Sequence, residues 1–453
     1  MSIFKAYDIR GLVPEQLSAG DAYAIGRATA RFLARFRSGP IAVGRDARRS
    51  SPELAAALVR GLGDEGSDVF DLGLVSTPML YFAVEHLAAA GGVMVTASHN
   101  PGQYNGLKVC REHAIPVGGA SGLREIEALS RELREAPPAK TRGRVTSRDV
   151  RSAYVDHVMA LAPRACPRLR LAIDCGNGMG SVGLEPVLER LPLAVERLYF
   201  EPDGTFPNHE ADPLKVENLH DLMAAVKRSG ADLGVAFDGD GDRAMFVDEH
   251  ARPIPADRIT ALLAGPLLRR HPGARVLYDL RSSRATAEAI EAAGGASEMC
   301  RVGHSFVKAA MRENGAVFAG ELSGHFYFRF SETLVADDGL AAFLALLDVL
   351  ASEGGPISRL VEPLERYYAS GEINRKVTDV NAVLRAIERE HAEAPEISHL
   401  DGLLVRYPDW WFNLRPSNTE PLLRLNLEAS TPKEMGARRD ALLSRIEELS
   451  AAS

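Results

Sequence analysis

One pattern occurs three times along this chain of 453 residues. Each copy begins with a short apolar run, rich in β-forming residues, that ends in a polar loop: Ile41–Asp46, Leu169–Asp174 and Val276–Asp279. A helical pattern follows each run, as in Pro52–Gly61 and Thr286–Ala293. The length allows about three domains of this kind, with room for a smaller fourth.

Downstream of each helical pattern lies a second apolar run that also ends in a polar loop. These runs are Gly92–Ser98, Leu233–Asp238 and Gly315–Glu321. The repetition predicts three diverged copies of one α/β module. An ordinary α/β protein that alternates strands and helices without repeating them remains the alternative.

The strands of these modules are apolar on both faces and are separated by helices, which predicts mainly parallel sheets. Ligand sites in such sheets form beyond the carboxyl ends of the strands, where the three polar loops fall. Two segments with linker composition, Glu135–Gly143 and Glu353–Pro356, mark the expected ends of the first and third modules.

The last ninety or so residues follow a different pattern. Leu422–Glu428 alternates apolar and polar side chains, which predicts a strand with one face in water, and a terminal helix is expected over Lys433–Leu449. We therefore expect a smaller α+β domain at the C-terminus. The predicted domains are 1–144, with the first loop, 145–252, with the second, 253–360, with the third, and 361–453.

Composition excludes several classes of protein. The chain has 53 Lys and Arg against 61 Asp and Glu, a net charge of −8, which argues against a nucleic-acid surface. Charged residues near the N-terminus prevent a signal-peptide core, and the apolar stretch Leu340–Ala351 is interrupted by Asp348 and too short to span a membrane. The four cysteines show no metal or disulfide spacing. We expect a cytoplasmic protein with no membrane partner, as a monomer or weak dimer.

The first conspicuous loop, Thr96–Pro101, places a hydroxyl among turn-forming residues at the end of a strand. Ser98 there is a candidate nucleophile. The loop lacks the GxSxG elbow of α/β-hydrolases, and Ser98–His99 alone does not predict an acyl-transfer triad. The alternative is a turn in which Asn100 and Pro101 only shape the backbone.

The second loop, Asp238–Arg243, brings three carboxylates together on a glycine-loosened segment, which suits a hard cation such as Mg²⁺. Its acidic residues and Glu249 also fit positions 1, 3, 5 and 12 of an EF-hand. However, Arg243 stands where an EF-hand requires glycine, and a strand rather than a helix precedes the loop. An acidic turn without a cation is the remaining alternative, which mutual repulsion of the carboxylates disfavours.

Two further loops complete the set. Gly320–His325 offers a carboxylate, a hydroxyl and an imidazole, which suit hydrogen bonds to sugar hydroxyls. Arg415–Thr419 combines a guanidinium with hydroxyls, an amide and turn-prone backbone N–H groups, the material of an anion site. Taken separately, either loop can be read as an ordinary turn.

Together with Lys5–Gly11, these four loops resemble the α-D-phosphohexomutases, most closely the bacterial phosphomannomutase/phosphoglucomutase group. The motifs TASHNP, DGDGDR, GELSGH and RPSNTEP occur in the family's order over nearly the whole chain. The resemblance implies three related α/β domains and a C-terminal domain around one central cleft.

The resemblance also assigns roles to individual residues. It implies that Ser98 carries a phosphoryl group and joins Asp238, Asp240 and Asp242 in holding Mg²⁺, and that Arg243 neutralises charge. Phospho-Ser98 would phosphorylate a hexose 1- or 6-phosphate, and the hexose 1,6-bisphosphate formed, which also serves as activator, would return its other phosphate to Ser98. The substrate contacts it implies are Tyr7, Arg10, Asn100, His304, Glu321, Ser323, Arg415, Ser417, Asn418 and Thr419.

Some details stay open within this resemblance. Lys108, His99 and His325 are candidates for the base that accepts the sugar hydroxyl proton, with Lys108 and His325 ranked first by family position. Arg281, another substrate contact, stands where many relatives carry lysine, and the two side chains are not interchangeable.

Two other functions are weighed against this one. Phosphoglucosamine mutases share the architecture, but their third loop usually reads GEQSGH, whereas this chain has Leu322. A non-catalytic sugar-phosphate sensor is the second alternative. Ser98 and the three aspartates argue against it, because a sensor has no need of a phosphoryl carrier.

Overall fold

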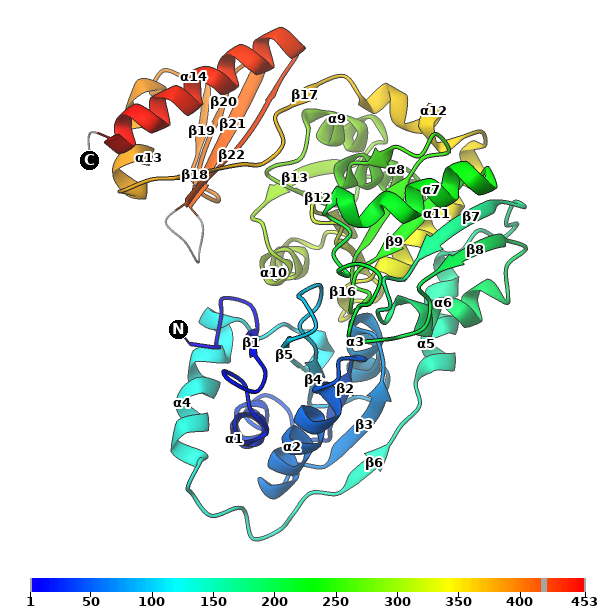
Figure 1. The fold of residues 1–453 in the computed structure, drawn as a ribbon, viewed down its shortest axis with the longest axis vertical. Coiled ribbons are helices and arrows are strands. Elements are labelled where there is room, and N and C mark those ends of the chain that lie inside the picture. The colour runs from blue at the N-terminus through cyan, green and yellow to red at the C-terminus, as the bar shows by residue number, and fades with distance from the viewer. Residues whose placement is uncertain (1, 417–421, 452–453) are drawn as a thin grey trace.

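The computed structural model describes residues 2–416 and 422–451 and arranges them around four sheets (Figure 1). The first sheet has the strand order β1-β5-β4-β2-β3-β6. Its last strand, β6, lies just beyond the expected boundary at 144, at residues 145–147. The elements of this first unit are β1 (Ile9–Leu12), α1 (Ala19–Leu33), β2 (Ile41–Arg45), α2 (Ser51–Asp64), β3 (Val69–Leu74), α3 (Thr77–His86), β4 (Gly91–Val95), β5 (Tyr104–Arg111), α4 (Arg124–Leu133) and β6 (Val145–Ser147).

The second and third sheets have five strands each, in the orders β11-β10-β9-β7-β8 and β13-β12-β14-β15-β16. The second unit contains α5 (Arg151–Val158), β7 (Arg170–Asp174), α6 (Gly180–Leu188), β8 (Ala194–Leu198), α7 (His220–Ser229), β9 (Leu233–Phe237), β10 (Ala244–Val247) and β11 (Pro253–Ile254). The third contains α8 (Ala256–Arg270), β12 (Arg275–Asp279), α9 (Arg284–Ala292), β13 (Ala296–Cys300), α10 (His304–Asn314), β14 (Phe318–Gly320), β15 (Phe326–Arg329), β16 (Val335–Asp337), α11 (Gly339–Glu353) and α12 (Ile357–Val361).

The three sheets share one design, in which parallel and antiparallel pairs are mixed. Each has parallel pairs that extend to one edge of the sheet, but the strand before the conspicuous loop pairs antiparallel with the strand after it: β4 with β5, β9 with β10, and β14 with β15. These connections are too short for the crossover that a parallel pair requires. The three loops therefore occupy equivalent hairpin positions, as three copies of one module predict.

One apolar core joins the first three units. The side of the first sheet covered by α1, α2 and α4 has its own core, whereas α3 packs with residues of the second and third units in a single large cluster. Helix α11 lies in this shared core, and its residues from Gly339 to Leu347 are all buried, so this stretch is apolar on every face. The first three units are thus held as one body by hydrophobic burial.

Among the described residues, no single helix is long and apolar enough to cross a membrane. One pair of segments, Gly339–Glu353 with Ile357–Leu364, meets the length and composition test only when joined across an 89° bend.

The C-terminal unit is a separate layer of strands covered by two helices (Figure 1). The strand order is β17-β22-β21-β20-β19, with β18 also paired to β22. The terminal helix confirms the sequence prediction. The elements are β17 (Tyr368–Ala369), β18 (Ile373–Lys376), α13 (Val380–Glu390), β19 (Glu396–Ser398), β20 (Leu403–Arg406), β21 (Trp410–Pro416), β22 (Leu422–Ala429) and α14 (Pro432–Ala451).

The expectation that one face of β22 is in water is wrong near its end. Asn426 and Glu428 are buried on the polar face. The Glu428 carboxylate accepts hydrogen bonds from Trp411 Nε1 at 2.9 Å and from the backbone N–H of Arg284 at 3.0 Å. This face packs against the third unit, so the Glu428 carboxylate finds protein donors instead of water.

Candidate active site

Ser98 lies where the loops of the first and second units meet. Its backbone is left-handed, with φ of 52°, and its N–H donates to Thr96 Oγ1 at 2.9 Å. The Ser98 hydroxyl donates to Asp238 Oδ2 at 3.0 Å and is only 2% exposed as a residue. The second loop passes so close that a Cβ on Gly239 would lie 2.4 Å from the Ser98 carbonyl oxygen. Glycine at 239 therefore allows the two loops to approach each other.

The three aspartates of the second loop form a compact buried cluster. Asp238, Asp240 and Asp242 are at most 1% exposed, and each offers an oxygen within 4.8 Å of the others. The loop is flanked by β9 and β10, which confirms that it is not an EF-hand. Two cations face it: Lys108 Nζ lies 2.6 Å from both Asp240 and Asp242, and Arg243 Nε lies 3.7 Å from Asp238.

This cluster suits a metal cation because its negative charge is not balanced. Three carboxylates face two cationic side chains. Burial is the main cause that holds the pKa of Asp238 well above its usual value, and the charges of Asp242 and Asp240 add to it. Oδ1 of Asp240 and Oδ1 of Asp242 are buried and accept no hydrogen bond from any described residue. Unpaired carboxylate oxygens around a loop are the donors that Mg²⁺ prefers.

The three base candidates differ in their surroundings. Burial lowers the pKa of Lys108, but Asp240 and Asp242 outweigh it and raise that pKa well above its usual value, so Lys108 is held as an ammonium ion. His99 Nδ1 faces Arg243 Nη2 at 2.9 Å, and the Arg243 charge together with burial holds the pKa of His99 far below its usual value. In this arrangement Lys108 keeps its proton, and His99 Nδ1 faces a guanidinium N–H of Arg243.

His325 is placed differently. Its Nε2 lies 3.3 Å from the Arg243 Nε–H and 3.5 Å from Asp242 Oδ1, and its Nδ1 lies 2.9 Å from Ser323 Oγ. A neutral ring that accepts from Arg243 at Nε2 carries its proton on Nδ1, toward Ser323. Nε2 is then the nitrogen without a proton, and it lies beside Arg243 and the acidic loop.

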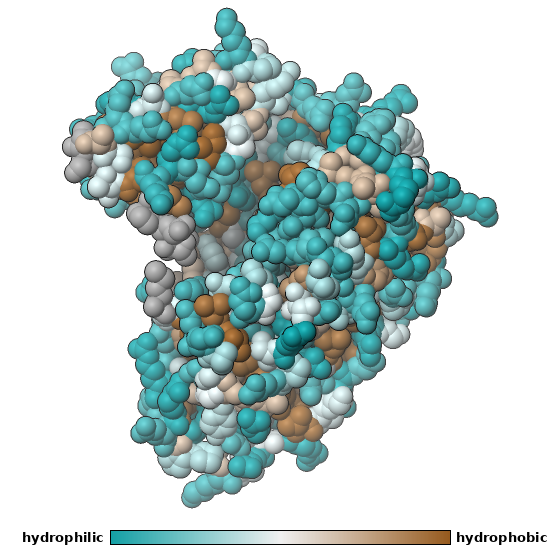
Figure 2. Space-filling model, viewed as in Figure 1, coloured by the Kyte–Doolittle hydropathy of each residue, from teal (hydrophilic) through white to brown (hydrophobic). Residues whose placement is uncertain are grey.

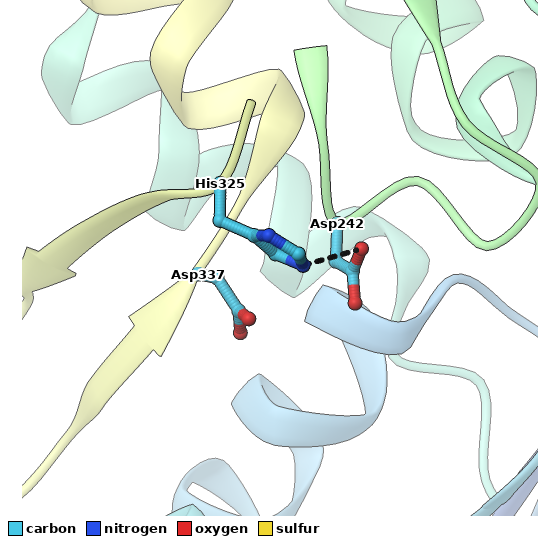
Figure 3. Close-up of side chains that lie close together, drawn as sticks. All are labelled: Asp242, His325 and Asp337. Carbon is cyan, nitrogen blue, oxygen red and sulfur yellow. Dashed lines mark ion pairs between the residues drawn. The ribbon is translucent and has the colours of Figure 1, made fainter. Parts of the chain in front are cut away.

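Figure 3 shows a residue that the sequence motifs did not indicate, Asp337, beside His325 and Asp242. Asp337 forms an ion pair with Lys308 at 2.6 Å, and both residues are 0% exposed. The ammonium group already neutralises Asp337, which argues against a second cation here. The pair links α10 to β16 behind His325; these positions are far apart in sequence, and only the fold brings them together.

The third loop faces the N-terminal segment. The buried Glu321 carboxylate accepts from the backbone N–H of Gly303 at 2.7 Å and from the Tyr327 hydroxyl, and it keeps lone pairs for further donors. Tyr7 packs edge-on against His304, with ring centroids 5.8 Å apart. The first unit thus meets the third beside the sugar-contact candidates.

Two of the residues expected to contact substrate, Arg10 and Asn100, lie together. Arg10 Nη1 donates to Asn100 Oδ1 at 2.6 Å, and Arg10 Nη2 pairs with Asp8. This contact links the N-terminal strand to the Ser98 loop.

A cavity of about 840 Å³ separates the third unit from the C-terminal unit, and Arg281, Ser323 and Glu372 are among its lining residues. Figure 2 shows the surface hollowed between the C-terminal unit and the first unit. Arg415 Nη2 lies 3.3 Å from Glu372, and Arg281 Nη1 lies 3.7 Å from the same carboxylate. Ser417, Asn418 and Thr419 lie outside the described residues.

The fold and site define an enzyme built from three repeated α/β units with a hydroxyl beside an acidic cluster. Family models for the α/β/α domains I, II and III of phosphoglucomutase/phosphomannomutase match residues 1–136, 152–251 and 255–367, and the model for its C-terminal domain matches 372–444. The chain belongs to the phosphoglucomutase/phosphomannomutase family and is a phosphohexomutase.

Similar proteins cover nearly its whole length. A Xanthomonas campestris pv. campestris (strain B100) protein named "Phosphohexose mutases" is 42% identical over 94% of both chains. The phosphomannomutase of Escherichia coli (strain K12) is 39% identical over 99% of both. A solved phosphoglucomutase/phosphomannomutase family protein from Burkholderia thailandensis has a TM-score of 0.91 and 34% identity, covering 99% of this chain and 97% of its own.

Proposed function

We propose that this phosphohexomutase interconverts the 1- and 6-phosphates of glucose and mannose through a phosphoserine at Ser98. The observation that carries the proposal is the Ser98 hydroxyl at 3.0 Å from Asp238, beside a buried cluster of three carboxylates. A hydroxyl in such a place is too weakly nucleophilic on its own and needs its developing charge stabilised.

Mg²⁺ fits the donors present. Asp238, Asp240 and Asp242 would hold it together with Ser98, and its charge would offset the dianionic phosphoserine and the serine oxygen that departs. Arg243, 8% exposed and close to both Asp238 and His325, adds a fixed positive charge at the same place.

The transfer itself exchanges one P–O bond for another. The bond between phosphorus and Ser98 Oγ breaks while a bond forms to the free hydroxyl oxygen of the hexose phosphate, whose proton passes to Nε2 of His325. The bisphosphate then presents its other phosphate to Ser98, and the same steps run in reverse. Phosphoryl transfer asks the protein mainly for positioning and charge stabilisation, which these residues provide.

The phosphate that does not react needs its own site. Arg415 and Arg281 both lie within 4 Å of the Glu372 carboxylate, and Arg281 and Glu372 line the cavity between the third and C-terminal units. Guanidinium groups bind phosphate through two parallel hydrogen bonds. We assign this site to the distal phosphate of either monophosphate, with Tyr7, Arg10, Asn100, His304, Glu321 and Ser323 as the sugar contacts.

Intact-mass measurement tests the phosphoserine. The purified protein, after incubation with glucose 1,6-bisphosphate, is expected to carry one phosphoryl group, which excess hexose 6-phosphate removes. Peptide mapping should place the group on Ser98. A protein that catalyses the interconversion but never carries phosphate would contradict the proposal.

Sugar specificity gives a second test. Glucose and mannose differ only at C2, so a site that binds the 3- and 4-hydroxyls through Glu321 and Ser323 should convert both 1-phosphates. Galactose 1-phosphate is inverted at C4 and should be converted about 5- to 150-fold less well, because an unmet buried polar group costs roughly 1–3 kcal/mol. Coupled assays with the three sugars and with glucosamine 1-phosphate measure this. Preferred turnover of glucosamine 1-phosphate would favour the phosphoglucosamine mutase alternative.

A further inference from the structure

Arg48 lies under the Ser98 loop, and neither the sequence motifs nor the substrate contacts include it. It follows β2 in the first unit and is 1% exposed as a residue. A buried guanidinium must find acceptors for its five N–H groups, since burying a charge without partners is costly. The acceptors of Arg48 show what it holds in place.

Four of its acceptors are backbone carbonyls of one loop. Nη2 donates to the carbonyl oxygens of Ser98 at 2.7 Å and Asn100 at 2.6 Å. Nη1 donates to those of Pro101 at 2.7 Å and Tyr104 at 3.1 Å. The flat guanidinium thus ties both sides of the hairpin connection between β4 and β5 to a single point.

The remaining contacts fix the guanidinium itself. Nε donates to Asp46 Oδ2 at 3.0 Å, and Asp46 also accepts from the backbone N–H of Arg48 at 3.0 Å and from Ser51 Oγ at 2.5 Å. The Phe206 ring, from the second unit, lies 5.0 Å from Cζ of Arg48. A Cβ on Gly204 would lie 2.1 Å from Arg48 Cα, so the second unit also closes over this residue.

We infer that Arg48 is a positioning residue for the phosphoryl-transfer step, because it holds Ser98 in its left-handed conformation with Oγ directed at Asp238. The inference rests on the proposed role of Ser98. A left-handed non-glycine residue is strained and persists only where surrounding contacts over-determine it. The same serine oxygen must also lie in one place when it gives and when it receives the phosphoryl group.

The chain offers a matched control. Arg27 is equally buried, 1% exposed, and lies in the same unit. It donates to three backbone carbonyls, of Leu133, Ala136 and Pro137, at 2.6–2.8 Å, and pairs with Glu65 at 2.9 Å. Arg27 therefore ties down a surface segment after α4 in the way that Arg48 ties down the Ser98 loop.

The experiment compares Arg48→Lys with Arg27→Lys in the full-length chain. A lysine ammonium cannot span four carbonyls from one plane. Arg48→Lys is expected to lower kcat about 100-fold, since a misplacement of about 1 Å costs that much, while KM stays within threefold. Its rate of phosphoryl uptake from glucose 1,6-bisphosphate, followed by intact mass, should fall in parallel. Both variants should lower the melting temperature by a similar amount. Arg27→Lys, however, should leave kcat within twofold.

The outcomes separate this inference from the proposed function. If the unchanged protein carries phosphate on Ser98 but Arg48→Lys keeps kcat within threefold, the positioning role is wrong and the phosphoserine stands. Equal losses of kcat in both variants would also overturn it. If Arg48→Lys does not fold, Asp46→Asn replaces it, because this variant removes the ion pair that fixes Nε of Arg48. Asp46→Asn should lower kcat at least tenfold with KM unchanged. An unchanged kcat in Asp46→Asn would overturn the inference.

Discussion

Replacing Ser98 with alanine is expected to lower kcat by at least about 10⁴-fold, the scale seen when a covalent nucleophile is removed from an enzyme. The variant should bind hexose phosphates and should never gain a phosphoryl group by intact mass. Its melting temperature should change little, because the Ser98 hydroxyl makes polar contacts only, with Asp238 Oδ2 at 3.0 Å and with His99 Nδ1 at 3.2 Å.

The control for this variant is Ser331→Ala. Ser331, like Ser98, is a serine in a loop, but its loop is the turn between β15 and β16. Its hydroxyl accepts hydrogen bonds from the backbone N–H groups of Thr333 and Leu334. It should keep kcat within twofold. Turnover of Ser98→Ala within tenfold of the unchanged enzyme would mean that the phosphoryl group travels by another route.

The loops could be predicted from sequence because each is a local signal. Ser98, the three aspartates and Glu321 each follow an apolar run directly, and strand ends are where chemistry collects in α/β proteins. The hairpin geometry was not predicted. Apolar runs show that a strand is buried. The direction of the neighbouring strand depends instead on the length of the connection between the two strands.

The charges around the loops depend on contacts between distant parts of the chain. Lys108 meets Asp240 across 132 positions and the Ser98 hydroxyl meets Asp238 across 140. No periodicity within either segment encodes such a pairing. The resemblance suggested Lys108 as a base, whereas two carboxylates at 2.6 Å make it a counter-ion in this structure.

Arg48 illustrates the same limit more strongly. In sequence it is one arginine among several polar residues after β2, and nothing marks it as buried. Its role follows from four carbonyls that the next strands bring over it. Likewise, the alternating pattern of β22 predicted a face in water because it shows which side chains are polar. The pattern does not show whether another domain covers that face.

Metal dependence gives the second large expected effect. Asp240→Asn keeps the shape of the side chain but removes one of three negative charges, so the two carboxylates that remain are matched by Lys108 and Arg243. The attraction for a divalent cation then falls steeply. We expect kcat to drop about 10³-fold, as when a group that stabilises developing charge is lost, with partial recovery at high Mg²⁺.

Two measurements decide this case. EDTA should abolish the activity of the unchanged enzyme, and added Mg²⁺ should restore that activity. Calorimetry should detect Mg²⁺ binding to the unchanged enzyme, and Asp240→Asn should lose this binding whether or not substrate is present. Asp348→Asn, which removes a carboxylate that pairs with Arg270 at the surface, serves as the control and should keep both properties. An EDTA-resistant enzyme would leave only Lys108 and Arg243 to balance the phosphoserine. Because the three buried aspartates already outnumber those two cations, no remaining positive charge would offset the phosphoserine, and the result would contradict the proposed metal role.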